Sequence, residues 1–215
     1  MTTVSTVGTE SVDGRKARRD RNREAVLDAV IELFSDGNLR PTPDEVARRS
    51  GVSLRSVYRY VEDSTDLIRA AIDRHVERVA PLFAVSALGE GALDMRIDRF
   101  LASRLTAYET VGPTARASRM AATRSPLIAA QLDRARVQLR RQFEAHFAKE
   151  VASLAPTARP GVVAAGDALT QMDNIDFFRH IRGFSRDETM SLLAPALAAL
   201  LSSGDSARAR RSTSA

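Results

Sequence analysis

Apolar residues recur along most of the chain at the three- and four-residue spacing of one face of an α-helix. The first such face is formed by Val26, Leu27, Val30, Ile31 and Phe34. It predicts a helix over about residues 16–35 that ends at Gly37-Asn38. No alternating run long enough for a β-strand is found. The pattern therefore predicts an all-α protein with about nine helices.

Capping and turn residues divide the rest of the chain into further helices. Thr42 with Glu45 and Ser185 with Glu188 have the spacing of capping boxes, which mark helix starts. Breaks are expected at Gly112-Pro113, at Ser125-Pro126, between Pro156 and Pro160, and at Gly183. The expected helices cover about residues 43–49, 54–61, 64–81, 90–110, 114–123, 126–153, 161–182 and 186–202. Residues 1–14 are interpreted as a disordered arm and residues 204–215 as a disordered tail.

The charge distribution favours a polyanionic partner. The net charge is +5 and the isoelectric point about 10.3. Between Arg15 and Arg23 lie six basic residues and one acid, and residues 46–61 contain four arginines and no acid. Because each phosphate that a cation neutralises releases condensed counterions, such clusters favour nucleic acid. The chain has no cysteine, three histidines and no apolar run of membrane-spanning length, so we expect a cytoplasmic protein without cofactor or metal.

Residues 44–60 have the pattern of a helix-turn-helix. Ala47 is small where two helices cross, Gly51 suits a turn with positive φ, and Val52 and Val57 provide apolar packing positions. A second helix held in this way can enter the DNA major groove. Its exposed residues would be Ser53, Leu54, Arg55, Ser56, Tyr58 and Arg59. The alternative is an α-helical hairpin with a solvated basic face.

These residues carry a resemblance to a known family. The segments Ala25–Phe34 (AVLDAVIELF), Glu45-Val46-Ala47, Gly51-Val52-Ser53 and Val57–Val61 (VYRYV) resemble the N-terminal domain of the tetracycline-repressor (TetR) family over about residues 20–70. The resemblance implies a homodimer with a helix-turn-helix DNA-binding domain at residues 15–65 and a ligand-binding and dimerisation domain at residues 66–203. It further implies a transcriptional regulator, a repressor released from a palindromic DNA operator when a small molecule binds.

The resemblance also assigns roles to individual residues. It places phosphate contacts on Thr42, Tyr58 and Tyr60, and base contacts on Leu54, Arg55, Ser56 and Arg59. Two departures stand out. The segment Glu62–Asp66 lacks the lysine that usually opens the fourth helix, although Thr65 could donate a hydroxyl there, and the loop Asn38–Pro41 lacks the usual glycine-aromatic pair. Arg18 and Arg19, ahead of the first helix face, could reach a minor groove or form a solvated basic tail.

The second half of the chain offers several hypotheses about a ligand. Residues 99–141 contain nine arginines and two acids, which could line a pocket for a carboxylate or acyl thioester, form a solvated face, or pair with acids of the DNA-binding domain. Candidate pocket residues, which could equally be core, are Phe83, Phe100, Leu101, Tyr108, Met120, Phe143, Phe147, Met172 and Phe177. Asp173, Asp176 and His180 share one helix face, but they fall short of a usual metal site and also fit a polar rim.

The last two helices are interpreted as a dimer interface. The last helix has more apolar surface than a single stripe needs, at Leu192, Leu193, Leu197, Leu200 and Leu201. With Ala164, Ala165, Ala168 and Leu169 of the helix before it, these residues fit a four-helix bundle across a two-fold axis. Two other classes of protein remain open. One is an all-α enzyme or small-molecule carrier, for which no nucleophile–base pair or phosphate loop is found, and we expect no enzyme. The other is a non-specific architectural DNA binder.

Overall fold

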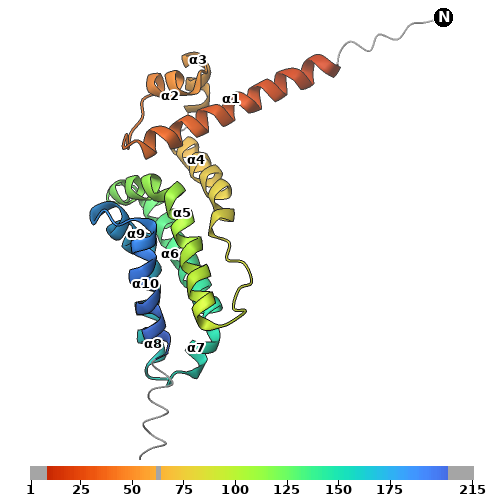
Figure 1. Ribbon diagram of the computed structural model, residues 1–215. Helices are drawn as coiled ribbons and strands as arrows, with labels where there is room; N and C mark the ends of the chain where they lie inside the picture. The colour runs from red at the N-terminus through yellow and green to blue at the C-terminus, as the bar shows by residue number, and fades with distance from the viewer. Residues whose placement is uncertain (1–8, 62–63, 203–215) are drawn as a thin grey trace, which may run out of the picture. The chain divides into compact units, whose positions relative to one another are not determined.

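The computed structural model describes residues 9–61 and 64–202, with side chains from residue 14 to 60 and from 67 to 202. Most of these residues are helical, and no strand occurs among them, as expected. The chain divides into two compact units, residues 1–78 and 79–215 (Figure 1). None of the described helices is both long and apolar enough to cross a membrane.

Four helices build the first unit: α1 (Thr9–Ser35), α2 (Pro43–Ser50), α3 (Leu54–Val61) and α4 (Ser64–Val79). Helix α1 begins at Thr9, so residues 9–14, expected to belong to a disordered arm, are helical. Gly37 follows α1 with a φ of 94°, a conformation that glycine adopts without strain, and this turn ends the helix as expected. The long α1 continues past α2 and α3 toward its N-terminus (Figure 1).

The core of the first unit gathers apolar residues from all four helices. Its buried members are Val26, Leu27, Ala29, Val30, Ile31, Leu33, Val46, Val52, Val57 and Ala71. Helix α4 is also tied to α1 by charge, because Arg74 and Arg78 both bind Asp28. These contacts explain why the boundary lies at Arg78 and Val79 rather than at the expected residues 65 and 66.

In the second unit a short 3₁₀ turn, η1 (Ala80–Phe83), is followed by seven described helical segments. They are α5 (Leu93–Ala122), α6 (Pro126–His146), α7 (Ala148–Ser153), α8 (Arg159–Thr170), α9 (Met172–Asp176), a π-helical turn η2 (Phe177–Ile181) and α10 (Arg186–Leu201). The described chain thus has ten α-helices rather than nine. The expected helix at 126–153 is interrupted at Phe147, and the one at 161–182 at Gln171, where ψ is 150°.

Helix α5 runs through Pro113, where a break was expected. A proline inside a helix removes one hydrogen bond to the carbonyl four residues earlier, here that of Glu109. Both Pro113 and Glu109 are exposed, so water can bind the freed carbonyl. The uninterrupted helix brings Tyr108, Arg116 and Arg119 to one side of α5, which matters for the polar contacts described below.

Two apolar clusters fill the second unit. The larger contains Ile97, Phe100, Leu101, Phe143, Phe147, Leu154, Val162, Leu193, Leu197 and Leu201, and the smaller Val79, Leu105, Tyr108, Val111, Met172 and Ile175. We call them cluster A and cluster B. Gly166 allows α8 to approach α6 closely, since a Cβ at this position would lie 2.2 Å from the Phe143 ring.

Candidate nucleic-acid interface

The helix-turn-helix begins at a capping box on α2. The Thr42 hydroxyl accepts a hydrogen bond from the Glu45 N–H at 3.3 Å, and the Thr42 N–H donates to the Glu45 carboxylate at 2.7 Å. Pro43 follows as the first helical residue, where its missing N–H costs nothing. The start of α2 is therefore determined by local sequence, as expected from the spacing of Thr42 and Glu45.

Gly51 makes the turn between α2 and α3. Its φ of 68° lies in the left-handed region, and its N–H donates to the Ala47 carbonyl at 3.0 Å. Val52, directly after the turn, and Val57, on α3, are both buried in the core of the first unit. Because α3 packs through Val57, its opposite side is available to solvent.

The exposed side of α3 is basic and aromatic. Arg55, Tyr58 and Arg59 are exposed, whereas Leu54 and Ser56 are half-buried. Within the described residues, Arg55 and Arg59 form no ion pair. The exposed Ser53 donates its hydroxyl to Ser56 at 3.0 Å. All six residues expected on this face thus lie at least partly at the surface.

The arginines of α2 are not equivalent to those of α3. Arg49 binds the carboxylates of Glu32 and Asp36 on and just after α1, at 3.4 and 2.9 Å. Its guanidinium therefore holds α2 against α1. Unlike Arg55 and Arg59, Arg49 is a cation of this motif that is already paired with acids.

Arg18 and Arg19 lie on helix α1, with exposed side chains, and not on an extended arm. Tyr60, at the end of α3, donates its hydroxyl to the Arg19 carbonyl at 3.2 Å, and the Arg59 guanidinium stacks 5.4 Å from the Tyr60 ring centre. The basic start of α1 and the end of α3 are thereby joined. An arm that follows a minor groove in extended form is not compatible with these positions.

Two of the phosphate contacts implied by the family resemblance have other partners in this structure. The Thr42 hydroxyl donates to Glu45 at 2.8 Å, and the Tyr60 hydroxyl donates to Arg19. Tyr58 is 53% exposed, so its hydroxyl faces solvent. Thr65 lies outside the residues whose side chains are described.

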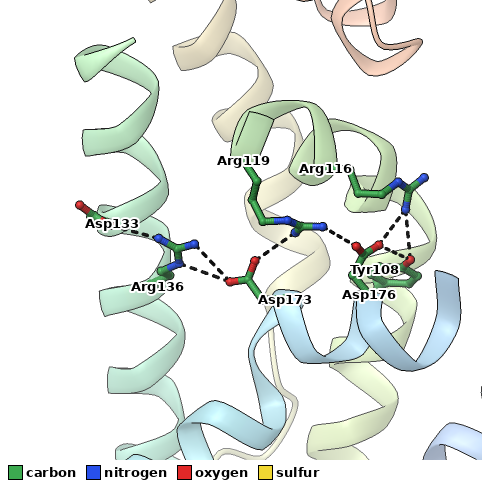
Figure 2. A network of polar contacts seen from close by, with 7 residues as sticks. All are labelled: Tyr108, Arg116, Arg119, Asp133, Arg136, Asp173 and Asp176. Atoms are coloured by element: carbon green, nitrogen blue, oxygen red, sulfur yellow. Dashed lines mark hydrogen bonds and ion pairs between the residues drawn. The ribbon is translucent and has the colours of Figure 1, made fainter. Parts of the chain in front are cut away.

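In the second unit, several of the arginines between residues 99 and 141 are paired with acids of the same unit. Arg116 and Arg119 on α5 both bind Asp176, and Arg119 also reaches Asp173 at 3.1 Å (Figure 2). Arg136 on α6 binds Asp173 at 3.3 Å and Asp133 at 3.2 Å. Together with Tyr108 these residues form what we call the Asp176 network. The idea that such arginines pair with the DNA-binding domain is thus wrong for Arg116, Arg119 and Arg136.

Asp176 lies at the centre of this network and is buried. Burial alone would raise the pKa of its carboxyl, but hydrogen bonds from Tyr108 and Arg116 and the charges of Arg119 and Arg116 lower the pKa below its ordinary value. Burial and the bond to Asp176 raise the pKa of Tyr108 to about 12. Asp173 and Asp176 therefore bind arginines, His180 is exposed, and no metal-binding group of three or more acids and histidines occurs in the described part of the chain.

The chain is similar to proteins of known function in sequence and in fold. Over 106 residues it is 31% identical to the curated "HTH-type transcriptional repressor KstR" of Mycolicibacterium smegmatis, which covers 49% of this chain and 50% of the relative. The chain thus spans about half the length of the curated relative it matches. It also resembles the crystal structure of a TetR-family transcriptional regulator from Streptomyces coelicolor, with a TM-score of 0.67, 23% identity, and coverage of 87% of this chain and 83% of that one. No protein-family model matches the chain.

The chain therefore has the fold of that TetR-family regulator. The all-α architecture is confirmed by this likeness, and the sequence match to KstR agrees with the resemblance to TetR-family regulators. One of these proteins is a transcriptional repressor and the other a transcriptional regulator.

The expected pocket residues do not surround one site. Phe100, Leu101, Phe143 and Phe147 belong to cluster A, and the three phenylalanine rings pack against one another. Tyr108 and Met172 belong to cluster B, against which Phe83 packs. Met120 and Phe177 are 63% and 45% exposed. The set is thus divided between two core clusters and the surface.

The expected dimer residues are also divided. Leu193 and Leu197 are buried in cluster A of the same chain, and Leu169 and Leu200 are half-buried beside it. Two of the four leucines, Leu193 and Leu197, are therefore covered by their own chain and are not available to a second copy. Helices α8 and α10 contact each other. Their exposed positions include Ala164, Ala165, Ala168, Leu192, Pro195 and Ala196, which we call the α8–α10 face.

Sequence reasoning missed two fully buried arginines on α5. Arg96 binds Glu150 through both guanidinium nitrogens and also reaches the His146 carbonyl. Arg104 has no acidic partner among the described residues and is considered below. A signal was present, because Arg104 lies four residues after Phe100 and four before Tyr108, in register with the buried stripe.

Proposed function

We propose that this protein is a homodimeric DNA-binding transcription regulator whose DNA binding changes when a small molecule binds residues 79–202. The observation that carries the proposal is the exposed basic side of α3, held out by the Gly51 turn and the buried Val57. Further support comes from the similarity to a protein titled a transcriptional repressor and to another titled a transcriptional regulator.

In this proposal α3 enters the major groove. The guanidinium groups of Arg55 and Arg59 are suited to the O6 and N7 atoms of guanine, and Tyr58 to a phosphate oxygen. The exposed cations at the start of α1, among them Arg18 and Arg19, add attraction to the backbone that depends on salt. Arg49 takes no part, since it binds Glu32 and Asp36.

Dimerisation would use the α8–α10 face. Alanines at 164, 165 and 168 leave room for a partner helix to approach closely, and Leu192, 47% exposed, adds a larger apolar contact. Two copies related by a two-fold axis would present two α3 helices about 34 Å apart, which matches a palindromic operator. A small molecule that favours a different spacing would weaken operator binding by its coupling free energy, typically about 1–3 kcal/mol. In that case the protein is a repressor released by its ligand.

Selection of random duplex DNA by the purified full chain, followed by sequencing of the bound pool, tests the proposal. We expect a palindrome with half-sites about one helical turn apart. The Arg55→Ala variant should lose enrichment at defined base pairs, whereas Arg49→Ala should select the same palindrome. A pool without any sequence preference, bound with a steep salt dependence, would show an architectural DNA binder instead.

The dimer is tested by Ala168→Glu, with Ala130→Glu as the matched control at an exposed position of α6. Two glutamates brought together at a two-fold interface repel each other and bury charge, so this variant should sediment as a monomer. Its operator affinity should fall by about a hundredfold or more, because each half-site then binds alone. A dimeric Ala168→Glu protein with unchanged operator affinity would exclude the α8–α10 face.

A further inference from the structure

Arg104 is a buried cation that forms no ion pair among the described residues. Its side chain on α5 is 0% exposed. One terminal nitrogen donates to the Gln142 amide oxygen, the other donates to the Leu139 carbonyl at 3.1 Å, and the guanidinium lies 4.5 Å from the centre of the Phe100 ring. An ionised group without a counter-ion is expensive to bury, so this arrangement needs an explanation.

Arg96, the other buried arginine of α5, differs from Arg104 in its partners. Arg96 lies two turns earlier on the same helix, is as deeply buried, and has Glu150 as a bidentate partner. Arg104 forms no ion pair within the described residues, and its Nε–H is buried without any hydrogen-bond partner. Burial lowers the pKa of Arg104 to about 10, although the charge of Asp167 opposes this shift. Asp167 itself accepts a hydrogen bond from Gln171.

A second unpaired group lies close by. Gln171 donates to the Arg136 carbonyl at 3.3 Å and to Asp167 at 2.6 Å, but its buried amide oxygen has no partner within the described residues. Arg136 and Leu139, the α6 carbonyls that these two side chains bind, are three residues apart, which is roughly 4.5 Å along a helix. Arg104 and Gln171, each with an unpaired polar atom, therefore bind carbonyls within one turn of each other on α6.

The surroundings indicate the rest of the ligand. Phe100, whose ring the guanidinium faces, belongs to cluster A, and Leu139, whose carbonyl the guanidinium binds, packs against cluster B. The guanidinium thus lies where the two apolar clusters meet. Arg104 carries one positive charge, and its Nε is a guanidinium nitrogen with no hydrogen-bond partner among the described residues, which suits a singly charged oxyanion.

We propose that Arg104 binds the carboxylate of an apolar small molecule, and that Gln171 accepts a hydrogen bond from a donor beside that carboxylate. The proposal rests on the ligand response proposed above and adds the chemical class of the ligand. It also selects one arginine from the nine between residues 99 and 141. A carboxylate at this place gives Arg104 the counter-ion that Glu150 provides for Arg96.

Calorimetry of the full chain with butanoate, heptanoate and decanoate, each compared with the alcohol of equal length, tests the proposal. At least one carboxylate should bind about tenfold or more tightly than its alcohol, because a charge-assisted hydrogen bond is lost with the carboxylate. Decanoate hydroxylated at its third carbon should bind more tightly than decanoate in the wild type and no more tightly in Gln171→Leu. Wild-type protein that binds none of the three carboxylates better than the alcohols would overturn the proposal.

The Arg104→Met variant should lose the preference for carboxylate over alcohol, and the control Arg140→Met, at an exposed arginine paired with Glu144, should keep it. An unchanged preference in Arg104→Met would overturn the proposal. If that variant does not fold, carbon-13 NMR of carboxyl-labelled decanoate on the wild type replaces it, and the bound carboxylate should stay ionised below its ordinary pKa of about 4 to 5. Operator selection by the same ligand-free protein is independent of these results, so failure here leaves the DNA-binding proposal intact.

Discussion

In the first unit the arginines of α3 face solvent, whereas in the second unit Arg96 and Arg104 on α5 are fully buried. Helix α3 spans Leu54–Val61 and packs on one side, so Arg55 and Arg59, one turn apart, share the opposite side. Helix α5 spans Leu93–Ala122 and is covered on several sides, so its arginines must find carbonyls or carboxylates inside the protein.

The contrast teaches that the number of arginines in a segment says little about its partner. Residues 46–61 and residues 99–141 are both rich in arginine and poor in acids. In the first segment Arg55 and Arg59 remain exposed without acidic partners among the described residues, whereas Arg49 is bound to α1. In the second segment, acids from distant positions such as Asp173 and Asp176 neutralise Arg116, Arg119 and Arg136.

The largest expected effect on stability is that of Arg96→Met. The change leaves the half-buried Glu150 carboxylate and the His146 carbonyl without their partner, which typically costs about 3–5 kcal/mol of unfolding free energy for a buried pair. Urea unfolding measures it, with Arg140→Met as the control expected to stay within about 0.5 kcal/mol. Equal urea midpoints for Arg96→Met and Arg140→Met would show that the buried Arg96 contributes no more to stability than an exposed arginine.

Arg55→Ala should have the opposite profile. We expect operator affinity to fall by about 1–3 kcal/mol, as for loss of a bidentate base contact, and the free energy of unfolding to change by less than about 0.5 kcal/mol. Fluorescence anisotropy with a selected operator and urea unfolding measure the two quantities. Arg49→Ala should show the reverse, unchanged affinity with some loss of stability. Equal losses of operator affinity in Arg55→Ala and Arg49→Ala would contradict the distinction between α3 and α2.

A smaller effect is expected at the junction of α1 and α4. Asp28 accepts two hydrogen bonds of 2.9 Å from Arg74 and one of 3.1 Å from Arg78, and the bond from Arg74 lowers the pKa of its carboxyl despite partial burial. Asp28→Asn should therefore destabilise the first unit by about 1 kcal/mol. Asp73→Asn, at an exposed position of α4, should change nothing measurable in the same unfolding experiment. Equal stability of the two variants would remove charge as a reason for assigning α4 to the first unit.

The smallest expected effect is on the pH dependence of stability, to which each unit contributes one histidine. Burial lowers the pKa of His75 in the first unit and of His146 in the second, where Arg96 and Arg99 lower it further and the Arg96 carbonyl and Glu150 oppose them. A lowered pKa means that the unfolded chain binds the proton more readily, so stability present above about pH 6.5 is lost as the pH falls below it.

His146→Gln tests the contribution of the second unit. The ring accepts a hydrogen bond from the Gly89 N–H at 3.1 Å through Nδ1, and Nε2 lies 3.0 Å from the Arg96 carbonyl, so an amide can replace both contacts without titrating. The loss of unfolding free energy between pH 7 and pH 5 should be smaller in this variant than in the wild type, and His75→Gln should reduce it separately. Parallel pH profiles for the wild type and both variants would contradict this assignment.

The sequence by itself determined the features that depend on near neighbours. The capping box at Thr42 and Glu45, the left-handed turn at Gly51 and the buried positions Val52 and Val57 involve residues within a few positions of one another. Local hydrogen bonds and helix periodicity suffice for these features, which is why the helix-turn-helix and its exposed residues could be predicted. The same holds for the capping box that begins α10 at Ser185.

Only the tertiary structure decided which side chains are buried and which are paired. Helix α5 continues through Pro113 because the freed carbonyl faces solvent, and nothing in the residues around Gly112 shows this. Arg119 and Asp176 are 57 positions apart, and Arg104 and Gln142 are 38 apart. Periodicity identifies a face of a helix but not what covers it, because burial is a property of the packed elements and not of the segment.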